Sequence, residues 1–224
     1  MKKRNLLLAA LLLILVAPSF AAKVDTLLVN SPSMNKDVQV VVVTPDAALG
    51  KKAVACPVIY LLHGYGGNAK TWIGVKPDLP QIADEKGIIF VCPDGKNSWY
   101  WDSPKDPSYR YETFVSSELV KYIDGHYKTI ADRKGRAITG LSMGGHGAMW
   151  NAIRHKDTFG AGGSTSGGVD IRPFPLNWDM SKQLGEFAYN KKVWDEHTVI
   201  NQIDKIENGD LAIIIDCGEA DFFL

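Results

Sequence analysis

The chain has 224 residues, and its 25 Lys and Arg balance 25 Asp and Glu, so the formal net charge is 0. A neutral chain without a basic run gives no electrostatic reason to bind nucleic acid, and no such partner is expected. The length suits a single domain with a sizeable core.

The N-terminus has the layout of a secretory signal peptide. Basic residues at 2–4 precede an apolar run at 6–17 and a small-residue site at 19–21. The apolar run is too short to cross a bilayer of about 30 Å. We therefore expect cleavage after Ala21, a secreted or periplasmic protein without a membrane anchor, and a single mature domain at residues 22–224 with a charge of 0 − 3 = −3.

Strand-like and helix-like segments alternate along the mature chain. Residues 24–46 suggest an antiparallel hairpin, and 170–208 an irregular, partly helical insertion. Short apolar runs predict strands at 57–62, 88–95, 135–140 and 211–218, with a small-residue strand or loop at 159–168. Helical patterns cover 78–87, 111–127 and the segment after residue 142 to about 155. This alternation predicts an α/β fold with a mostly parallel sheet covered on both faces.

Four glycine-rich or polar loops each follow a predicted strand. They begin with "HGYGGN", "PDGKNSWYWDSP", "GLSMGGHG" and "DCGEADFF". Ligand sites in parallel sheets form where loops leave the carboxyl ends of the strands. We expect the four loops to converge on one rim.

The loop at 140–147 contains a nucleophile motif, Gly140-Leu141-Ser142-Met143-Gly144. It follows a strand and begins a helix, as a G-x-S-x-G elbow requires. Side chains at the two glycine positions would collide across so tight a turn. The alternative is a glycine-rich turn with an incidental serine. The context favours Ser142 as a nucleophile.

A nucleophilic serine needs two backbone N–H donors for the oxyanion. One should be Met143, directly after the nucleophile. The other should come from "HGYGG", most plausibly Tyr65. A phosphate loop is excluded because no G-x-x-x-x-G-K-[ST] spacing is present.

The acid should follow the last core strand, in the chain order Ser, acid, His. Asp216 lies within that strand, whereas Asp221 lies beyond the glycine in a loop. Asp221 is therefore preferred to Asp216. The alternative is that Asp221 is an ordinary solvent-exposed aspartate of the loop without a catalytic role.

No histidine follows Asp221, and four of the five that precede it suit another place. We expect His63 to shape the oxyanion loop, His126 to end a surface helix and His146 to lie beneath the nucleophile. His155 should cap its helix, and His197 is a weak candidate for the base. The chain also stops directly after an apolar strand, which leaves a hydrophobic edge. We therefore expect a further strand and helix to be missing at the C-terminus, which the parent gene beyond codon 224 would test.

Several stretches together resemble one known family. They are "YLLHGYGG", "SWYWDSP", "YRYETFV", "GLSMGGHGAM" and "STSGGVDIRPFP". They resemble the esterase D group of α/β-hydrolases, which includes S-formylglutathione hydrolases, tributyrin esterases and feruloyl and acetylxylan esterases. The resemblance implies an α/β-hydrolase fold with Ser142 as nucleophile, Asp221 as acid and the amides of Tyr65 and Met143 as the oxyanion hole. The family's histidine lies some tens of residues beyond the acid, in a segment that this sequence lacks.

The resemblance also implies a substrate pocket around residues 97–104. Trp99 and Trp101 could stack on a sugar or an aromatic acyl group, or they could pack the loop onto the rim. The three cysteines, Cys56, Cys92 and Cys217, lie in or beside apolar runs, which favours buried free thiols.

The resulting hypothesis is a secreted serine esterase that acts on small-molecule or carbohydrate-linked acyl esters through an acyl-enzyme, without a metal or organic cofactor. One alternative is acyl transfer to a sugar with the same residues. Another is a non-catalytic binding protein that has lost its base. For the 224-residue form we expect little turnover.

Overall fold

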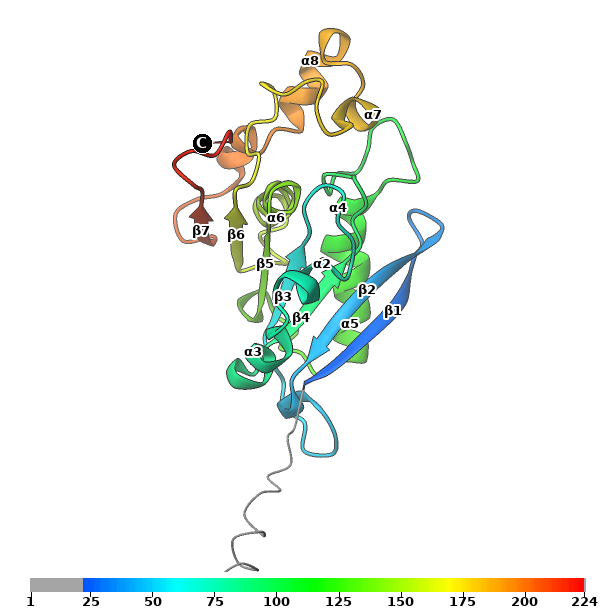
Figure 1. Ribbon diagram of the computed structural model, residues 1–224, viewed down its shortest axis with the longest axis vertical. Helices are drawn as coiled ribbons and strands as arrows, with labels where there is room; N and C mark the ends of the chain where they lie inside the picture. The colour runs from blue at the N-terminus through cyan, green and yellow to red at the C-terminus, as the bar shows by residue number, and fades with distance from the viewer. Residues whose placement is uncertain (1–21, 224) are drawn as a thin grey trace, which may run out of the picture.

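The computed structural model describes residues 22–223, and the predicted signal peptide lies outside this range. One sheet of seven strands, in the order β1-β2-β4-β3-β5-β6-β7, carries helices on both faces (Figure 1). β1 pairs antiparallel with β2, β2 pairs antiparallel with β4, and all other pairs are parallel. The strands are β1 (Lys23–Ser31), β2 (Lys36–Thr44), β3 (Val58–Leu62), β4 (Ile89–Pro93), β5 (Arg136–Gly140), β6 (Ala161–Thr165) and β7 (Ala212–Asp216). The predicted mostly parallel sheet with an N-terminal hairpin is confirmed.

Four consecutive valines in β2 show how the sheet buries both faces. Val40 and Val42 join the larger core cluster, whereas Val41 and Val43 join the smaller one, and none of the four is exposed. Successive side chains of a strand point to opposite faces, so an unbroken apolar run fits only a sheet that is covered twice.

The helices divide between these two faces. They are α2 (Thr71–Val75), α3 (Leu79–Lys86), α4 (Tyr111–Thr113), α5 (Leu119–His126), α6 (Met143–Arg154), α7 (Met180–Leu184) and α8 (Phe187–Glu196). α3 supplies buried residues to the smaller cluster, while α5 and α6 supply the larger one. α3 ends at Gly87, whose φ of 63° is the left-handed conformation that favours glycine.

The helix predicted at 111–127 is interrupted by a π-helical segment, Phe114–Glu118, between α4 and α5. Ser116 Oγ donates to the carbonyl of Glu112 at 2.7 Å within this wider turn. The Glu118 carboxylate accepts hydrogen bonds from Ser31 Oγ at 2.6 Å and from the Ser33 amide at 2.8 Å. The interrupted helix thereby ties the N-terminal hairpin to the domain.

The predicted insertion at 170–208 is partly helical, as expected. It comprises α7, α8 and a 3-10 segment, Val199–Lys205. It lies beyond the carboxyl ends of the parallel strands, at the top of Figure 1. The insertion therefore covers the rim where the loops were predicted to meet.

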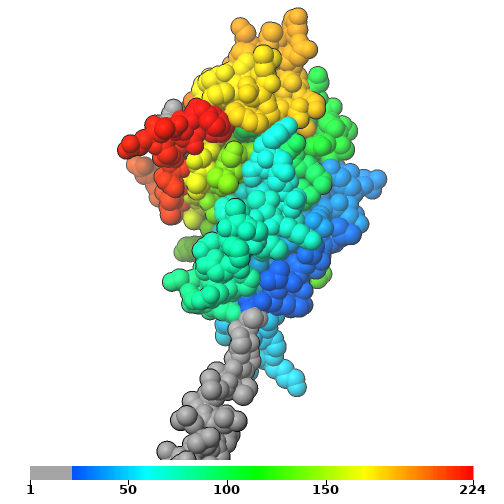
Figure 2. Space-filling model, viewed as in Figure 1, coloured from blue at the N-terminus to red at the C-terminus, as the bar shows by residue number. Residues whose placement is uncertain are grey.

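β7 forms one edge of the sheet and pairs only with β6 among the described strands. Its side chains Ile213, Ile214 and Ile215 are 38%, 75% and 63% exposed. The C-terminal segment lies beside the insertion on the outside of the molecule (Figure 2). The predicted hydrophobic edge strand is thus present.

The described cysteines are all free thiols. Cys56 and Cys92 are buried, as predicted, and burial raises the pKa of the Cys92 thiol to about 12. Cys217, just after β7, is only half-buried, which corrects the prediction for that residue.

Between residues 22 and 223, no helix is long and apolar enough to cross a membrane.

Candidate active site

Ser142 lies on the turn between β5 and α6, at the N-cap position of the helix. Its φ of 56° and ψ of −118° are values that residues other than glycine rarely adopt. Its amide donates to the carbonyl of Thr165 at 2.9 Å, which holds the strained turn against the end of β6. This is the strand-turn-helix context expected of a nucleophile elbow.

The two glycines of the motif are needed for steric reasons. A Cβ on Gly140 would lie 2.3 Å from the carbonyl oxygen of Gly144, and one on Gly144 would lie 2.2 Å from that of Leu62. Real Cβ atoms essentially never come so close to another heavy atom. The predicted collision across the turn is confirmed for Gly140, whereas a Cβ on Gly144 would collide with the end of β3 instead.

The loop after β3 lies directly against this turn. A Cβ built on Gly64 would be 3.5 Å from Ser142 Cβ and 3.3 Å from the carbonyl oxygen of Leu141. Within the part of the chain that the structure describes, the amides of Tyr65 and Met143 donate no hydrogen bond. Two free N–H donors thus belong to the two segments that meet at Ser142, as an oxyanion hole requires.

His63 fixes the shape of this loop. Its Nε2 accepts a hydrogen bond from the Gly95 amide at 2.9 Å, so its Nδ1 carries the proton and donates to the carbonyl of Gly64 at 2.7 Å. The Tyr100 hydroxyl donates to the His63 carbonyl at 3.1 Å. The Gly66 amide donates to Asn97 Oδ1 at 2.9 Å. His63 therefore holds the loop, as predicted, and both its nitrogens are in use.

The loops after all five parallel strands reach one rim. The Ser166 amide, after β6, donates to the carbonyl of Asp216 at 2.8 Å. Asp216 is the last residue of β7, and Asp221 lies in the turn that follows. Asp221 Oδ1 accepts from the Phe223 amide at 2.9 Å, so this carboxylate at present stabilises its own turn. The predicted convergence is confirmed, and the catalytic role of Asp221 stays a prediction.

No histidine of the described chain forms a hydrogen bond with Ser142 Oγ or with Asp221. His146 lies in α6, one turn after Ser142; it is fully buried, and its Nδ1 bonds to the carbonyl of Gly168 at 2.8 Å. Burial lowers the pKa of His146 to about 4. His126 is exposed at the end of α5, and His155 is the C-cap of α6, as predicted.

His197, the weak candidate for the base, lies elsewhere. Its ring stacks on Trp150, with centroids 5.6 Å apart, and its Nδ1 bonds to the carbonyl of Val193 at 2.7 Å. Trp150 follows Ser142 by eight residues, which is about 12 Å along a helix. The structure therefore does not bring His197 to the nucleophile.

The indoles of Trp99 and Trp101 require a correction. They are only 1% and 0% exposed and stack on each other at a centroid distance of 5.7 Å. Each also meets the ring of His146 edge-on, at 5.1 and 5.0 Å. Neither indole offers a free face to a sugar or an acyl group, so the stacking prediction is wrong and the packing alternative holds.

Aromatic side chains that the sequence did not single out occupy the rim instead. Phe174, Trp178, Phe222 and Phe223 form one cluster, in which Trp178 stacks on Phe222 at 5.6 Å. Phe222 is 62% exposed. The insertion and the segment after β7 contribute two residues each, and no periodic pattern marked either segment. Only the tertiary structure brings them together.

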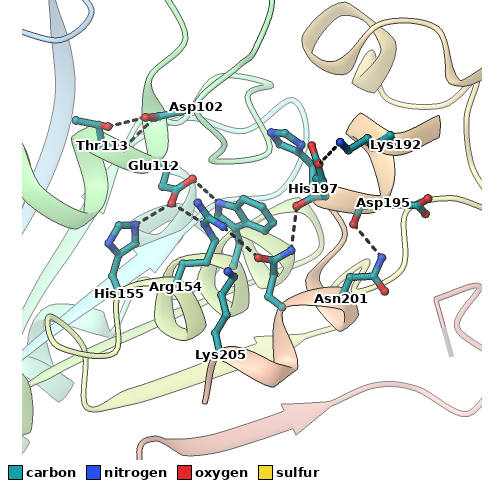
Figure 3. Close-up of a pocket in the computed structure, with 13 residues that line it drawn as sticks. Asp102, Glu112, Thr113, Arg154, His155, Lys192, Asp195, His197, Asn201 and Lys205 are labelled. Carbon is teal, nitrogen blue, oxygen red and sulfur yellow. Dashed lines mark hydrogen bonds and ion pairs between the residues drawn. The ribbon is translucent and has the colours of Figure 1, made fainter. Parts of the chain in front are cut away.

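A separate polar pocket of about 820 Å³ lies beside the far half of α6 (Figure 3). At its floor, Glu112 accepts hydrogen bonds from Trp150 Nε1, Arg154 Nε and His155 Nε2, each at 2.8 Å. Burial alone would raise the pKa of Glu112, but these donors hold it at about 2. The pocket does not include Ser142, and its floor ties α4 to α6. Among residues 22–223, no three His, Cys, Asp or Glu side chains are grouped to hold a metal ion.

Comparison with known proteins identifies the family to which the chain belongs. A family model described as a putative esterase matches residues 31–224. The chain is 28% identical to an esterase of Mycobacterium tuberculosis over 68% of its own length and 36% of that protein. It is 26% identical to the S-formylglutathione hydrolase of Bos taurus, over 80% of this chain and 68% of that one. The chain thus spans about a third of the first of these relatives.

Solved structures agree with the sequence comparison. A ferulic acid esterase superposes with a TM-score of 0.75 at 29% identity, over 92% of this chain and 82% of that one. An S-formylglutathione hydrolase from Agrobacterium tumefaciens gives a TM-score of 0.74 at 24% identity, over 92% and 79%, and supports the fold. The chain belongs to the putative esterase family, within the esterase D and S-formylglutathione hydrolase-like group of α/β-hydrolases.

Proposed function

We propose that the chain is a secreted serine esterase that hydrolyses acyl esters. The strained turn at Ser142 carries this proposal, because it meets the loop at Gly64, and each of these two segments has an amide, of Met143 and of Tyr65, that donates no hydrogen bond among the described residues. Relatives and a structural neighbour that are named as esterases support it. The signal-peptide pattern at residues 1–21 supports export.

In this proposal, Ser142 Oγ loses its proton to a base and attacks the ester carbonyl. The oxyanion accepts hydrogen bonds from the amides of Tyr65 and Met143. The C–O bond to the alcohol breaks, the alcohol leaves with a proton, and water then hydrolyses the acyl-serine. Asp221 would orient the base. Since no histidine in residues 22–223 reaches Ser142, we expect the 224-residue chain to turn over esters slowly.

Carbohydrate-linked esters are the proposed substrate class. The ferulic acid esterase neighbour, at 29% identity, supports an acyl group of this kind. The aromatic cluster on the same rim offers apolar surface through Phe222, which is exposed, and through the half-buried Phe174 and Trp178. Acyl transfer to a sugar would use the same residues and is distinguished by adding a sugar acceptor to the assay.

A non-catalytic binding protein is the second candidate. The absence of a histidine partner for Ser142 among the described residues favours it. Under this alternative the chain would bind an ester or a glycan without cleaving it.

The test compares the native chain with Ser142→Ala on a short p-nitrophenyl ester and on a feruloylated sugar. We expect slow hydrolysis by the native chain and none above background by the variant. Equal rates for both proteins would reject Ser142 as the nucleophile. Tight binding of the feruloylated sugar without any acyl-serine in the intact-protein mass would favour the non-catalytic candidate.

A further inference from the structure

The oxyanion loop has a second, unassigned attachment, to the insertion. The Tyr65 hydroxyl donates a hydrogen bond of 2.7 Å to Asp179 Oδ2, across 114 positions of sequence. The other carboxylate oxygen of Asp179 pairs with Lys182 Nζ at 2.9 Å. The loop after β3 and the start of the insertion lie side by side on the surface in Figure 2. Tyr65 is the same residue whose free amide lies in the loop beside Ser142.

The side chain of Asp179 does not make the hydrogen bond that an aspartate at its position usually makes. It is the N-cap residue of α7, where an aspartate side chain usually accepts a hydrogen bond from the first turn of its own helix. Here the carboxylate makes no such bond. Its two oxygens are directed to Tyr65 and Lys182 instead, so the contact with Tyr65 takes the place of the usual capping interaction.

The backbone at this point is strained as well. Trp178 and Asp179 have φ values of 50° and 56°, two successive left-handed residues that are not glycine. The carbonyl of Trp178 accepts a hydrogen bond from Trp99 Nε1 at 3.3 Å, which anchors the strained pair to the buried loop after β4. Strain of this kind concentrates at functional sites and persists only where the surroundings impose it.

We propose that Asp179 is a positioning residue for the oxyanion hole: through the Tyr65 side chain, it holds the Tyr65 amide towards Ser142. This inference rests on the proposed esterase function. Asp179 touches neither Ser142 nor the oxyanion, so it acts only through Tyr65. An oxyanion donor is useful only in the transition state, and loosening it lowers kcat with little effect on KM.

The kinetic test uses the full chain and an activated p-nitrophenyl ester, with Tyr65→Phe, Asp179→Ala and the double variant. We expect kcat to fall about tenfold in each, with KM within about twofold, and the double variant to be no worse than either single. Asp179→Asn keeps an acceptor oxygen and should recover most of the rate. Lys182→Ala removes only the outer ion pair and should match the native kcat.

A second measurement does not depend on turnover. Hydrogen exchange of the amides in residues 63–67 should become about tenfold faster in Tyr65→Phe and Asp179→Ala, but not in Lys182→Ala. Unchanged exchange, or native kcat in both single variants while Ser142→Ala is inactive, would overturn the role of Asp179. The role would also be overturned if the two variants showed a lower kcat, a higher KM and a lower thermal stability together. That result would mean that the bond between Tyr65 and Asp179 is a purely structural contact. Full turnover by Ser142→Ala would instead reject the esterase proposal, and exchange would still decide whether Asp179 fixes the loop.

Discussion

The amide of Ser142 donates a hydrogen bond of 2.9 Å to the carbonyl of Thr165, which secures a serine with φ of 56° to the end of β6. The strand pairing reaches the nucleophile itself, since Leu141 and Thr165 form an isolated parallel bridge at the same point. The neighbouring strand thus helps to impose the strained conformation. The local strain of Ser142 and the proposed chemistry of the site are two consequences of one geometry.

Replacing Ser142 by glycine should therefore stabilise the fold while it abolishes turnover. Glycine adopts positive φ without steric strain, and relief of such strain is worth about 1 kcal/mol. We expect the midpoint of urea unfolding to rise in Ser142→Gly. Ser142→Ala serves as the matched control, because it removes the hydroxyl but keeps the Cβ. An equal midpoint in both variants would show that the turn is not strained.

Gly144→Ala should destabilise the protein by roughly 3 kcal/mol. Its Cβ would lie 2.2 Å from the carbonyl oxygen of Leu62, a main-chain atom that cannot move without displacing β3. Gly125→Ala is the control in α5, where a Cβ meets nothing within 4 Å. That variant should gain about 0.5–1 kcal/mol from helix propensity. Comparable unfolding midpoints in the two variants would contradict the close approach at the elbow.

The sequence was a good guide wherever a local rule decides the structure. Glycine spacing predicted the turn at Ser142, because a side chain at position 140 or 144 would collide with main-chain atoms. Unbroken apolar runs predicted strands buried on both faces, as the valines of β2 illustrate. Both inferences start from a pattern within a few residues, and both hold, although the atoms that a Cβ on Gly144 would meet belong to β3 and the residue after it.

Local rules failed where distant segments decide. Trp99 and Tyr100 adopt the left-handed φ values of 57° and 60°. In the loop with this backbone, the indoles of Trp99 and Trp101 pack against His146 and are not exposed. Composition alone does not distinguish an aromatic loop that faces a ligand from one that packs inward. The bond between Tyr65 and Asp179 is also inaccessible to sequence patterns, because it joins an exposed tyrosine to an insertion without periodicity.

Acidification from pH 6.5 to pH 4 should destabilise the protein through His146. Burial depresses the pKa of its imidazole to about 4 in the folded chain, against an ordinary value of 6.5. The unfolded chain therefore binds more protons in this window, and stability present above pH 6.5 is lost as the pH falls through the folded pKa. The shift corresponds to roughly 3 kcal/mol at most.

Urea unfolding at half-unit pH steps measures this slope. His146→Gln should make this slope shallower between pH 4 and 6.5, and part of the slope should remain because burial also lowers the pKa of His197. A native slope that persists unchanged in His146→Gln would mean that another group titrates in this window.

The carboxylate of Glu112 should govern a second, more acidic window. Although burial opposes ionisation, donors from Trp150, Arg154 and His155 hold the pKa of Glu112 at about 2, below its ordinary 4.5. Its stabilising effect is therefore complete above pH 4.5 and is lost as the pH falls towards 2. At neutral pH, Glu112→Gln leaves Arg154 without its charge partner and should lower the free energy of unfolding by roughly 3 kcal/mol. Glu196→Gln, on the exposed wall of the same pocket, is the control and should change the free energy of unfolding by less than about 0.5 kcal/mol. A similar loss in both variants would show that the pocket's overall charge, and not the network at its floor, sets stability.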